Sequence, residues 1–372
     1  MNGALPTTTS QITTDWLTAV LQESGTIPAS VSVATATVDP QAGGIGFMGE
    51  VGKLTLTYDG DAGAAPTSMI AKFATQSPEV AALMHPTRVF EREHRFYERI
   101  AATSPVRTPE VYHVTCDVAD TAADEQYLLL LEDLGGLTLG DQLAGVSPEQ
   151  AEAALVGLAK HHARFWNGAG LEDAPFIPVI NGPLNKAGQG IYEASLPGFT
   201  AVFGDVLRPE MVPIAEAYGN NHPKMLDRFA AMPHTLVHFD YRADNLFFEG
   251  GAGEPTGDVV VIDWQSISVG GGAADVGYFM GQNLSTADRR EHEDRLLHRY
   301  HDTLVDNGVT DYPFEQFFDD YRLAVVYGWV IPVFAVGSLD SSSERAVALW
   351  TAVIERVQDA IFDHGAQEFI ER

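Results

Sequence analysis

Residues 234–250 read HTLVHFDYRADNLFFEG, and residues 258–265 read DVVVIDWQ. Each stretch contains a short apolar run rich in β-branched residues, and GGAGEPTG lies between them, which predicts two strands joined as a hairpin. Polar side chains stand where the strands begin and end. The sequence therefore brings Asp240, Asn245 and Asp263 toward the ends of one hairpin.

These three side chains are of the types that phosphoryl transfer requires. A carboxylate must accept the hydrogen bond of the attacking hydroxyl, and oxygen ligands must hold a divalent metal. The five-residue spacing lets Asp240 face the hydroxyl while Asn245 reaches the metal, and Asp263 leaves the buried run VVVID as a second metal ligand. Taken singly, Asp240 is also typical of a turn, Asn245 of a backbone cap and Asp263 of a strand end. Occurring together, in this order and between these strands, the three residues favour a kinase, an enzyme that transfers a phosphoryl group.

The first half of the chain predicts a helix followed by an antiparallel sheet. At 372 residues the chain exceeds the usual size of a single core, so we expect two lobes. A helix over 15–25, strands over 31–38, 51–60, 68–75, 111–118 and 126–134, and a helix within 87–104 follow from the hydrophobic periodicity.

The second half predicts a larger, mainly helical lobe, so the fold class is α+β, with two lobes. We place the hinge at Asp133 and the glycines after it, which gives lobes at 1–134 and 135–372. Ser147 and Pro148 open a helix, 167–221 reads as irregular with helical pieces, and three helices close the chain. The apolar run 323–339 contains Pro332, which favours a buried, bent or interrupted helix over a membrane span.

Composition excludes several partners. Acidic residues outnumber basic ones by 51 to 22, and a net charge of -29 repels nucleic acid and anionic lipid. The charge either keeps the protein soluble or attracts a cationic substrate. Cys116 has no second cysteine to pair with, and the N-terminus lacks a secretion signal, so a cytoplasmic location is expected. Oligomeric state is not readable.

The motifs HFDYRADN and IDWQ resemble those of the aminoglycoside phosphotransferase and choline kinase superfamily, and bacterial ecdysteroid kinase-like phosphotransferases in particular. The resemblance implies a protein-kinase-like fold, with ATP between the lobes and one or two Mg²⁺ ions. Phe239 stands where the family usually has glycine. Arg242 stands where protein kinases carry a lysine, and our hypothesis is that it neutralises charge on the γ-phosphoryl group.

The resemblance extends to the first half of the chain. Lys72 ends the apolar strand MIAKF, and Glu93 lies on the next helix. The resemblance implies that Lys72 contacts the α- and β-phosphates and that Glu93 holds it by an ion pair. Alternatively, Lys72 is a solvated lysine, and Glu93 is one acid among several, Glu91 and Glu98 included.

Further nucleotide contacts are expected at two places. The loop AGGIGFMGE, with Gly44, Gly46 and Phe47, lies between the first two strands, where its amides could cover phosphates. It lacks the Walker ending, and its glycines also suit a tight hairpin. At the hinge, Glu132 and Leu134 would offer backbone groups to adenine.

Two further segments match the family. Two adjacent histidines, His161 and His162 in LAKHHARFW, could suggest a metal site. They are expected to be structural, because consecutive side chains of a helix point in different directions. Asp275 in GGAADVGYF is expected to brace the catalytic loop through hydrogen bonds.

The chain is thus predicted to be an ATP-dependent kinase that phosphorylates a hydroxyl of a small organic acceptor. A nucleotide-binding pseudokinase and a small-molecule carrier are the alternatives. The acceptor is either cationic or an apolar, steroid-like or macrolide alcohol, and Tyr327, Trp329 and Phe334 suit either.

Overall fold

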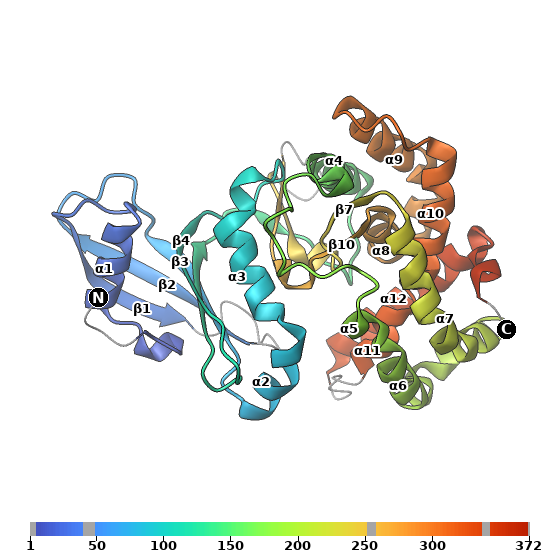
Figure 1. The fold of residues 1–372 in the computed structure, drawn as a ribbon, viewed down its shortest axis with the longest axis horizontal. Helices are drawn as coiled ribbons and strands as arrows, with labels where there is room; N and C mark the ends of the chain where they lie inside the picture. Colours follow the sequence, from blue (N-terminus) through green and yellow to red (C-terminus); the bar gives the residue numbers. More distant parts are fainter. Residues whose placement is uncertain (1–4, 40–48, 251–257, 337–342, 371–372) are drawn as a thin grey trace. The chain divides into compact units, whose positions relative to one another are not determined.

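The protein folds into two compact units. A computed structural model describes residues 5–39, 49–250, 258–336 and 343–370 (Figure 1). Unit 1 comprises 1–103 and 108–136, and unit 2 comprises 104–107 and 137–372. Unit 1 contains a five-stranded antiparallel sheet, and unit 2 is mainly helical, so the predicted α+β class is confirmed.

Unit 1 is a sheet with helices packed on it. The strand order is β1-β2-β3-β5-β4, and every neighbouring pair is antiparallel. The strands are β1 Ser32–Asp39, β2 Gly49–Asp59, β3 Ser68–Ala74, β4 Val111–Asp117 and β5 Gln126–Glu132. The helices are α1 Thr14–Glu23, α2 Pro78–Met84 and α3 Val89–Arg99.

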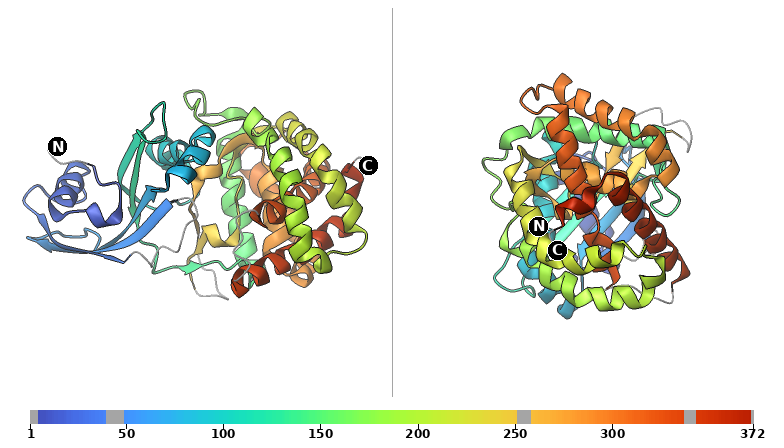
Figure 2. Two further views of the ribbon diagram at one scale, coloured as in Figure 1. Left: turned by 90° about the horizontal axis from the view of Figure 1, so that it is seen from below. Right: turned by 90° about the vertical axis from the view of Figure 1, so that its right-hand side faces the viewer.

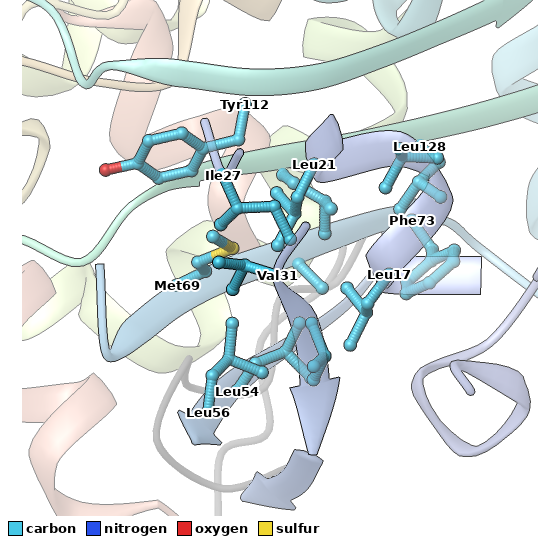
Figure 3. Close-up of a cluster of buried hydrophobic side chains, with 14 residues drawn as sticks. Leu17, Leu21, Ile27, Val31, Leu54, Leu56, Met69, Phe73, Tyr112 and Leu128 are labelled. Carbon is cyan, nitrogen blue, oxygen red and sulfur yellow. The ribbon is translucent and has the colours of Figure 1, made fainter. Parts of the chain in front are cut away.

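One face of the sheet forms the main core of unit 1. Alternate side chains of a strand point to opposite faces, so Met69, Ala71 and Phe73 of β3 share a face. Leu17 and Leu21 of α1 pack on this face, as the close-up shows (Figure 3). The apolar residues that recur at helical spacing in α1 therefore pack against the alternating apolar residues of the strands.

The other face of the sheet lies toward α3. Tyr127 of β5 packs with Val89 and Phe90 of α3, while Leu128 and Leu130 belong to the opposite core. The strand β5 is thus covered on both faces, as its uninterrupted apolar sequence predicts. By the same alternation Lys72 of β3 lies on the α3 face.

Unit 2 is built from helices with short strands among them (Figure 2). Its helices are α4 Pro148–Arg164, α5 Pro183–Lys186, α6 Gly188–Phe203, α7 Met211–Ala231, α8 Ala273–Asn283, α9 Thr286–Asp306, α10 Phe314–Tyr327, α11 Val330–Val336 and α12 Glu344–Asp363. Its strands are β6 Thr138–Leu139, β7 His234–Val237, β8 Leu246–Phe248, β9 Val259–Val261 and β10 Ser268–Gly271.

The predicted hairpin is present in unit 2. Strands β8 and β9 pair antiparallel, with Leu246 opposite Val261. Strand β7 pairs instead with β10. This register sets Asn245, just before β8, beside Ile262, just after β9, and the Ile262 N–H donates to the Asn245 carbonyl over 3.0 Å.

Helix α8 lies in the centre of unit 2, and all of its residues are buried. It packs tightly on α10, because a Cβ at Gly277 would lie 2.4 Å from the Cβ of Ala324. Glycine at this position is what allows the two helices to approach so closely. The tight packing fixes the position of α8. Through Asp275, α8 then supports the loop that follows β7.

The helices of unit 2 extend further than the sequence indicates. Residues 167–221 are predicted to be irregular with helical pieces, and these pieces are α5, α6 and the first half of α7, while 169–182 lie outside the helices. Pro197 and Pro223 lie inside these helices, and tertiary packing overrides the local breaking signal. Helix α2, capped by Ser77, was not expected. The break in the apolar run 323–339 falls at Gly328 and Trp329, and Pro332 lies in the first turn of α11.

Across the described ranges, none of the helices combines the length and apolarity needed to span a bilayer.

A buried ionic cluster ties three helices of unit 2 together. Glu293 of α9 accepts a hydrogen bond from Tyr321 of α10 and lies 2.9 Å from Nε2 of His364, which follows α12. Arg289 contacts both Glu293, at 3.1 Å, and Asp363. Burial alone would raise the pKa of Glu293, but the contacts with His364, Arg289 and Tyr321 lower it below 4.5 overall.

We predict that Glu293→Gln lowers the free energy of unfolding by about 2 kcal/mol at pH 7, because Arg289 and His364 lose a buried charged partner. A folded-state pKa below the unfolded one gives stability that is complete above pH 4.5 and is lost as the pH falls through the folded value. The difference between wild type and variant should therefore shrink in acid. Urea unfolding at pH 7 and in acid measures it, with exposed Glu291→Gln on the same helix as the control. Equal losses in both variants would contradict the prediction.

Candidate functional site

The candidate site is the loop between β7 and β8. The chain leaves β7 at Val237, runs through residues 238–242 and forms a 3-10 turn at Ala243–Asn245 before β8 begins. Tyr241 is buried and donates through its hydroxyl to the carbonyl of Ala154 in α4 over 2.8 Å. The Ala243 N–H donates to Oδ1 of Asn283 in α8, also over 2.8 Å. The loop is therefore anchored to two helices.

The Asp240 carboxylate is held by three side chains. Tyr278 of α8 donates through its hydroxyl to Oδ1 over 3.0 Å, and Nδ2 of Asn245 donates to Oδ2 over 3.1 Å. Nε of Arg242 lies 3.5 Å from Oδ1. About a quarter of the Asp240 side chain remains exposed, 24% by area. The carboxylate is thus oriented and still reachable by a ligand.

The electrostatics of Asp240 favour a basic carboxylate. Burial raises its pKa above the ordinary 3.8, Arg242 opposes this, and repulsion from Asp263 adds to it. Asn245 contacts Asp240 through its side chain and accepts at its carbonyl from the N–H of Ile262, the neighbour of Asp263. These contacts bring Asp240, Asn245 and Asp263 together in unit 2.

Two of these residues have the chemistry of a magnesium site. Nδ2 of Asn245 is directed at Asp240, so Oδ1 is the atom with which Asn245 would bind a cation. Asp263 follows β9 in a left-handed conformation, with φ 65°, and Gln265 donates to its Oδ2. Magnesium typically takes one or two protein carboxylates together with phosphate oxygens and water, so an amide oxygen and a carboxylate oxygen fit it.

Asp275 of α8 holds the backbone of the loop. Its Oδ2 accepts from the His238 N–H and its Oδ1 from the Phe239 N–H, each over 2.7 Å. His162 of α4 contacts the same carboxylate through Nε2 at 3.2 Å. The bracing contacts predicted for Asp275 are therefore present. The N–H groups of two successive residues point at one carboxylate. The backbone at Phe239, one of these two residues, is left-handed, with φ 65°.

Arg242 contacts two carboxylates. Its Nη1 donates to Oδ2 of Asp244 over 2.7 Å, and its Nε faces Asp240. Asp244 in turn accepts from the Gln142 N–H over 2.9 Å, which ties the loop to the segment after β6. Arg242 is thus held beside the carboxylate that the kinase hypothesis makes the base.

Sequence reasoning missed Tyr278 and Asn283 as partners of the loop. Both lie on α8, which also carries Asp275, and the helical spacing from Asp275 was a usable signal. The two adjacent histidines are structural, as expected. His161 contacts Ser104 Oγ and the Leu236 carbonyl, and His162 contacts Tyr300 and Asp275.

Unit 1 holds the second set of predicted residues. Nζ of Lys72 lies 2.7 Å from Oε1 of Glu93, whose side chain is almost fully buried. The ion pair that the resemblance implies is thus present, whereas Glu91 pairs with Arg95, and Glu98 with Arg95 and Arg99. Gly44, Gly46 and Phe47 lie outside the described residues.

The expected hinge segment begins at the end of β5. The Glu132 N–H donates to the Glu110 carbonyl over 2.8 Å, so this amide is not a donor for a ligand. Asp133 accepts from Ser68 and Lys53 and from the Gly135 N–H. Leu134 is buried. These contacts within unit 1 fix the backbone from Glu132 to Gly135.

Comparison with known proteins identifies the family. The model of the ecdysteroid kinase-like family matches residues 43–309, which is more than half of the chain. The chain belongs to the ecdysteroid kinase-like family. A search of curated proteins finds no match.

Solved structures share the fold of this ecdysteroid kinase-like chain. A putative aminoglycoside phosphotransferase from Ralstonia eutropha JMP134 is 17% identical, with a TM-score of 0.54 over 97% of this chain and 99% of that one. Choline kinase from Cryptosporidium parvum Iowa II is 10% identical, with a TM-score of 0.52 over 96% and 95%. A GDP complex of an aminoglycoside 2′-phosphotransferase-IIIa mutant is 11% identical, with a TM-score of 0.51 over 95% and 100%. The protein-kinase-like fold is thereby confirmed.

A small hollow in unit 2 of the ecdysteroid kinase-like chain lies beside the loop. It is lined by Phe239, Ala274, Asp275, Tyr278, Tyr327, Gly328 and Ile331. Of the three aromatic residues expected near an acceptor, Tyr327 lines it. Trp329 is fully buried and donates to the Tyr192 hydroxyl over 2.8 Å, so that expectation is wrong for Trp329. Phe334 packs edge-to-face with His222.

We predict that Asp275→Asn destabilises the protein by about 3 kcal/mol, because an amide group can accept from only one of the two N–H donors and leaves the other buried and unpaired. Urea unfolding measures the loss, and hydrogen exchange of the peptide covering 234–250 localises it. Asp294→Asn, at an exposed position of α9, is the control. Unchanged exchange at His238 and Phe239 would contradict the bracing role.

Proposed function

We propose that this ecdysteroid kinase-like chain is an ATP-dependent kinase that transfers the γ-phosphoryl group to a hydroxyl of a small organic acceptor. The observation that carries the proposal is the Asp240 carboxylate. It is partly exposed and oriented by Tyr278 and Asn245, and Asn245 in turn pairs with Ile262, the neighbour of Asp263. This is the set of oxygen-bearing groups that in-line phosphoryl transfer uses.

In this proposal Asp240 accepts the hydrogen bond of the acceptor hydroxyl and takes its proton. The acceptor oxygen forms a bond to the γ-phosphorus as the bond from that phosphorus to the β–γ bridging oxygen breaks, and ADP leaves. A pKa raised by burial makes the carboxylate a better proton acceptor. Arg242, which contacts Asp240, would neutralise charge on the transferred group.

Asn245 and Asp263 would hold Mg²⁺, which when bound neutralises charge on the β- and γ-phosphates. The support for this assignment is the donor set and the direction of the Asn245 amide. Removal of divalent metal should then abolish transfer.

Residues 1–134 would bind the nucleotide, and 135–372 would bind the acceptor and supply the base. Lys72, held by Glu93, would contact the α- and β-phosphates. The loop amides at Gly44, Gly46 and Phe47 would also contact phosphate. The backbone carbonyl of Glu132 and the backbone of Leu134 would contact adenine. Because one structure with the same fold is a GDP complex, GTP should be compared with ATP.

We predict that Asp240→Asn lowers kcat by a factor of about 10²–10⁴, because the amide cannot accept the proton, while nucleotide affinity changes little. ATP consumption with Mg²⁺ against alcohols of several classes, with detection of the phosphorylated product, measures kcat. Titration with a non-hydrolysable ATP analogue measures affinity. Glu249→Gln, at a half-exposed position beyond the loop where Glu249 pairs with Arg107, is the control.

Product formation by wild type separates a kinase from a pseudokinase or a carrier. If no alcohol is phosphorylated by wild type, the proposed function fails. Equal kcat for wild type and Asp240→Asn would remove Asp240 as the base.

We also predict that Glu93→Gln and Lys72→Met each lower kcat/KM for ATP, by about a hundredfold for Lys72→Met, because the phosphates lose a positioned cation. Glu91→Gln on the same helix is the matched control, since Glu91 pairs with Arg95 instead. Steady-state kinetics with varied ATP measure the effect. A loss in Glu91→Gln as large as in Glu93→Gln would reject the specific role of Glu93.

A further inference from the structure

Among the residues that the structure describes, Arg356 of α12 donates to three backbone carbonyls and to no carboxylate. Its Nη1 donates to the Gln142 carbonyl over 2.6 Å and to the Gln282 carbonyl over 3.1 Å, and its Nη2 donates to the Leu143 carbonyl over 2.9 Å. The side chain is half-buried. Because the N–H donors of a guanidinium form a rigid fork, Arg356 fixes these carbonyls relative to each other.

The three carbonyls belong to two segments of unit 2. Gln282 lies in the last turn of α8, where the helix dipole favours a cation. The other two carbonyls lie in the segment after β6, which packs directly on the loop after β7. A Cβ at Gly140 in this segment would lie 2.4 Å from the Ala243 carbonyl oxygen in the loop. Arg356 therefore joins α12 and α8 to the segment that contacts the loop.

The backbone of Gln142 connects Arg356 with the charged side chains of the loop. Its carbonyl accepts from Arg356, and its N–H donates to Oδ1 of Asp244 over 2.9 Å. Oδ2 of Asp244 accepts from Nη1 of Arg242 over 2.7 Å. Gln142 itself is buried, so its backbone has little room to move away from these contacts. An unbroken series of hydrogen bonds thus leads from α12 to the guanidinium of Arg242.

The position of Asp244 decides where the guanidinium of Arg242 lies. This guanidinium is shared between two carboxylates, through Nη1 with Asp244 and through Nε with Asp240 at 3.5 Å. The Asp244 side chain is 30% exposed, so packing alone does not fix it, and its hydrogen bond from Gln142 supplies the orientation. A displaced Gln142 would therefore move Asp244 and change the distance of Arg242 from Asp240.

We propose that Arg356 is a positioning residue for Arg242. By holding the backbone of Gln142, Arg356 fixes Asp244, and Asp244 sets the guanidinium of Arg242 where it meets the transferred phosphoryl group. This inference rests on the proposed function, in which Arg242 neutralises charge on that group. An Arg356 that only stabilised the fold would change the free energy of unfolding and leave the contact of Arg242 with phosphate unaltered.

The test measures what the γ-phosphate contributes to binding. Calorimetry on the full chain gives dissociation constants for ADP and for β,γ-imido-ATP, both with Mg²⁺. Their ratio reports contacts with the γ-phosphate, because the two ligands differ at that group. The variants are Arg242→Met, Arg356→Met and Arg356→Gln. The glutamine removes the same reach while staying polar, so it covers a failure of the methionine variant to fold.

The matched control is Arg345→Met. Arg345 also lies on α12 and contacts the same segment, but it is exposed and faces only the Asp141 side chain, at 3.4 Å. An exposed ion pair of this kind contributes little, so the ratio should stay at the wild-type value.

We expect Arg242→Met to lower the preference for β,γ-imido-ATP over ADP about tenfold, because the γ-phosphate loses a charged hydrogen bond. Both Arg356 variants should lower it about fivefold and leave ADP affinity unchanged, as a residue acting through its neighbours does. In an Asp244→Asn background, Arg356→Gln should have no further effect, because the series of contacts is already broken.

The ratio requires no phosphoryl transfer, so the two proposals fail separately. An unchanged ratio in the Arg356 variants, or an effect that persists in full beside Asp244→Asn, overturns the positioning role and leaves the kinase proposal standing. An unchanged ratio in Arg242→Met also overturns it, since Arg242 then has no contact to be positioned. If the ratios fall as expected but wild type phosphorylates no alcohol, the positioning role holds for nucleotide binding and the kinase proposal fails. If wild type binds neither nucleotide, both proposals fail.

Discussion

The organisation of the site depends on one buried carboxylate, that of Asp275. Its residue is fully buried, and a charge in that position is tolerated only if hydrogen bonds replace water. The replacements are the N–H groups of His238 and Phe239 and the imidazole of His162. Asp275 lies on α8, and the groups that bind it come from α4 and from the loop after β7. Hydrogen bonding to this one carboxylate therefore fixes three segments of unit 2 relative to each other.

The direction of the Asp240 side chain follows from the same helix. Three residues beyond Asp275, Tyr278 donates to the Asp240 carboxylate, while Asp275 holds the preceding backbone. Helix α8 therefore sets both where the loop turns and how its carboxylate points. The cost is backbone strain at Phe239, of order 1–3 kcal/mol for a left-handed residue of this type. Charge-assisted hydrogen bonds to Asp275 are strong enough to offset it.

The sequence predicted what depends on local period and on motif spacing. The resemblance to the kinase superfamily implied Lys72 and Glu93 as a pair, and the two motifs marked Asp240, Asn245 and Asp263. The sequence did not reveal features that depend on contacts between residues far apart in the chain. The helices that contain Pro197 and Pro223 are maintained by packing, which local propensity cannot register. Trp329 looks like a ligand contact in sequence, but its indole donates to a tyrosine 137 residues away.

The charges of the loop provide the electrostatic condition for the proposed chemistry. Asp240 and Asp244 share the guanidinium of Arg242, so this cation is divided between two carboxylates. Asp263 adds a third negative charge, and its repulsion contributes to the raised pKa of Asp240. A divalent cation held by Asn245 and Asp263 would bring phosphate oxygens with it to a place where carboxylates would otherwise repel them. Under the proposed function, the repulsion between phosphate and the carboxylates of this loop is what makes the site depend on metal.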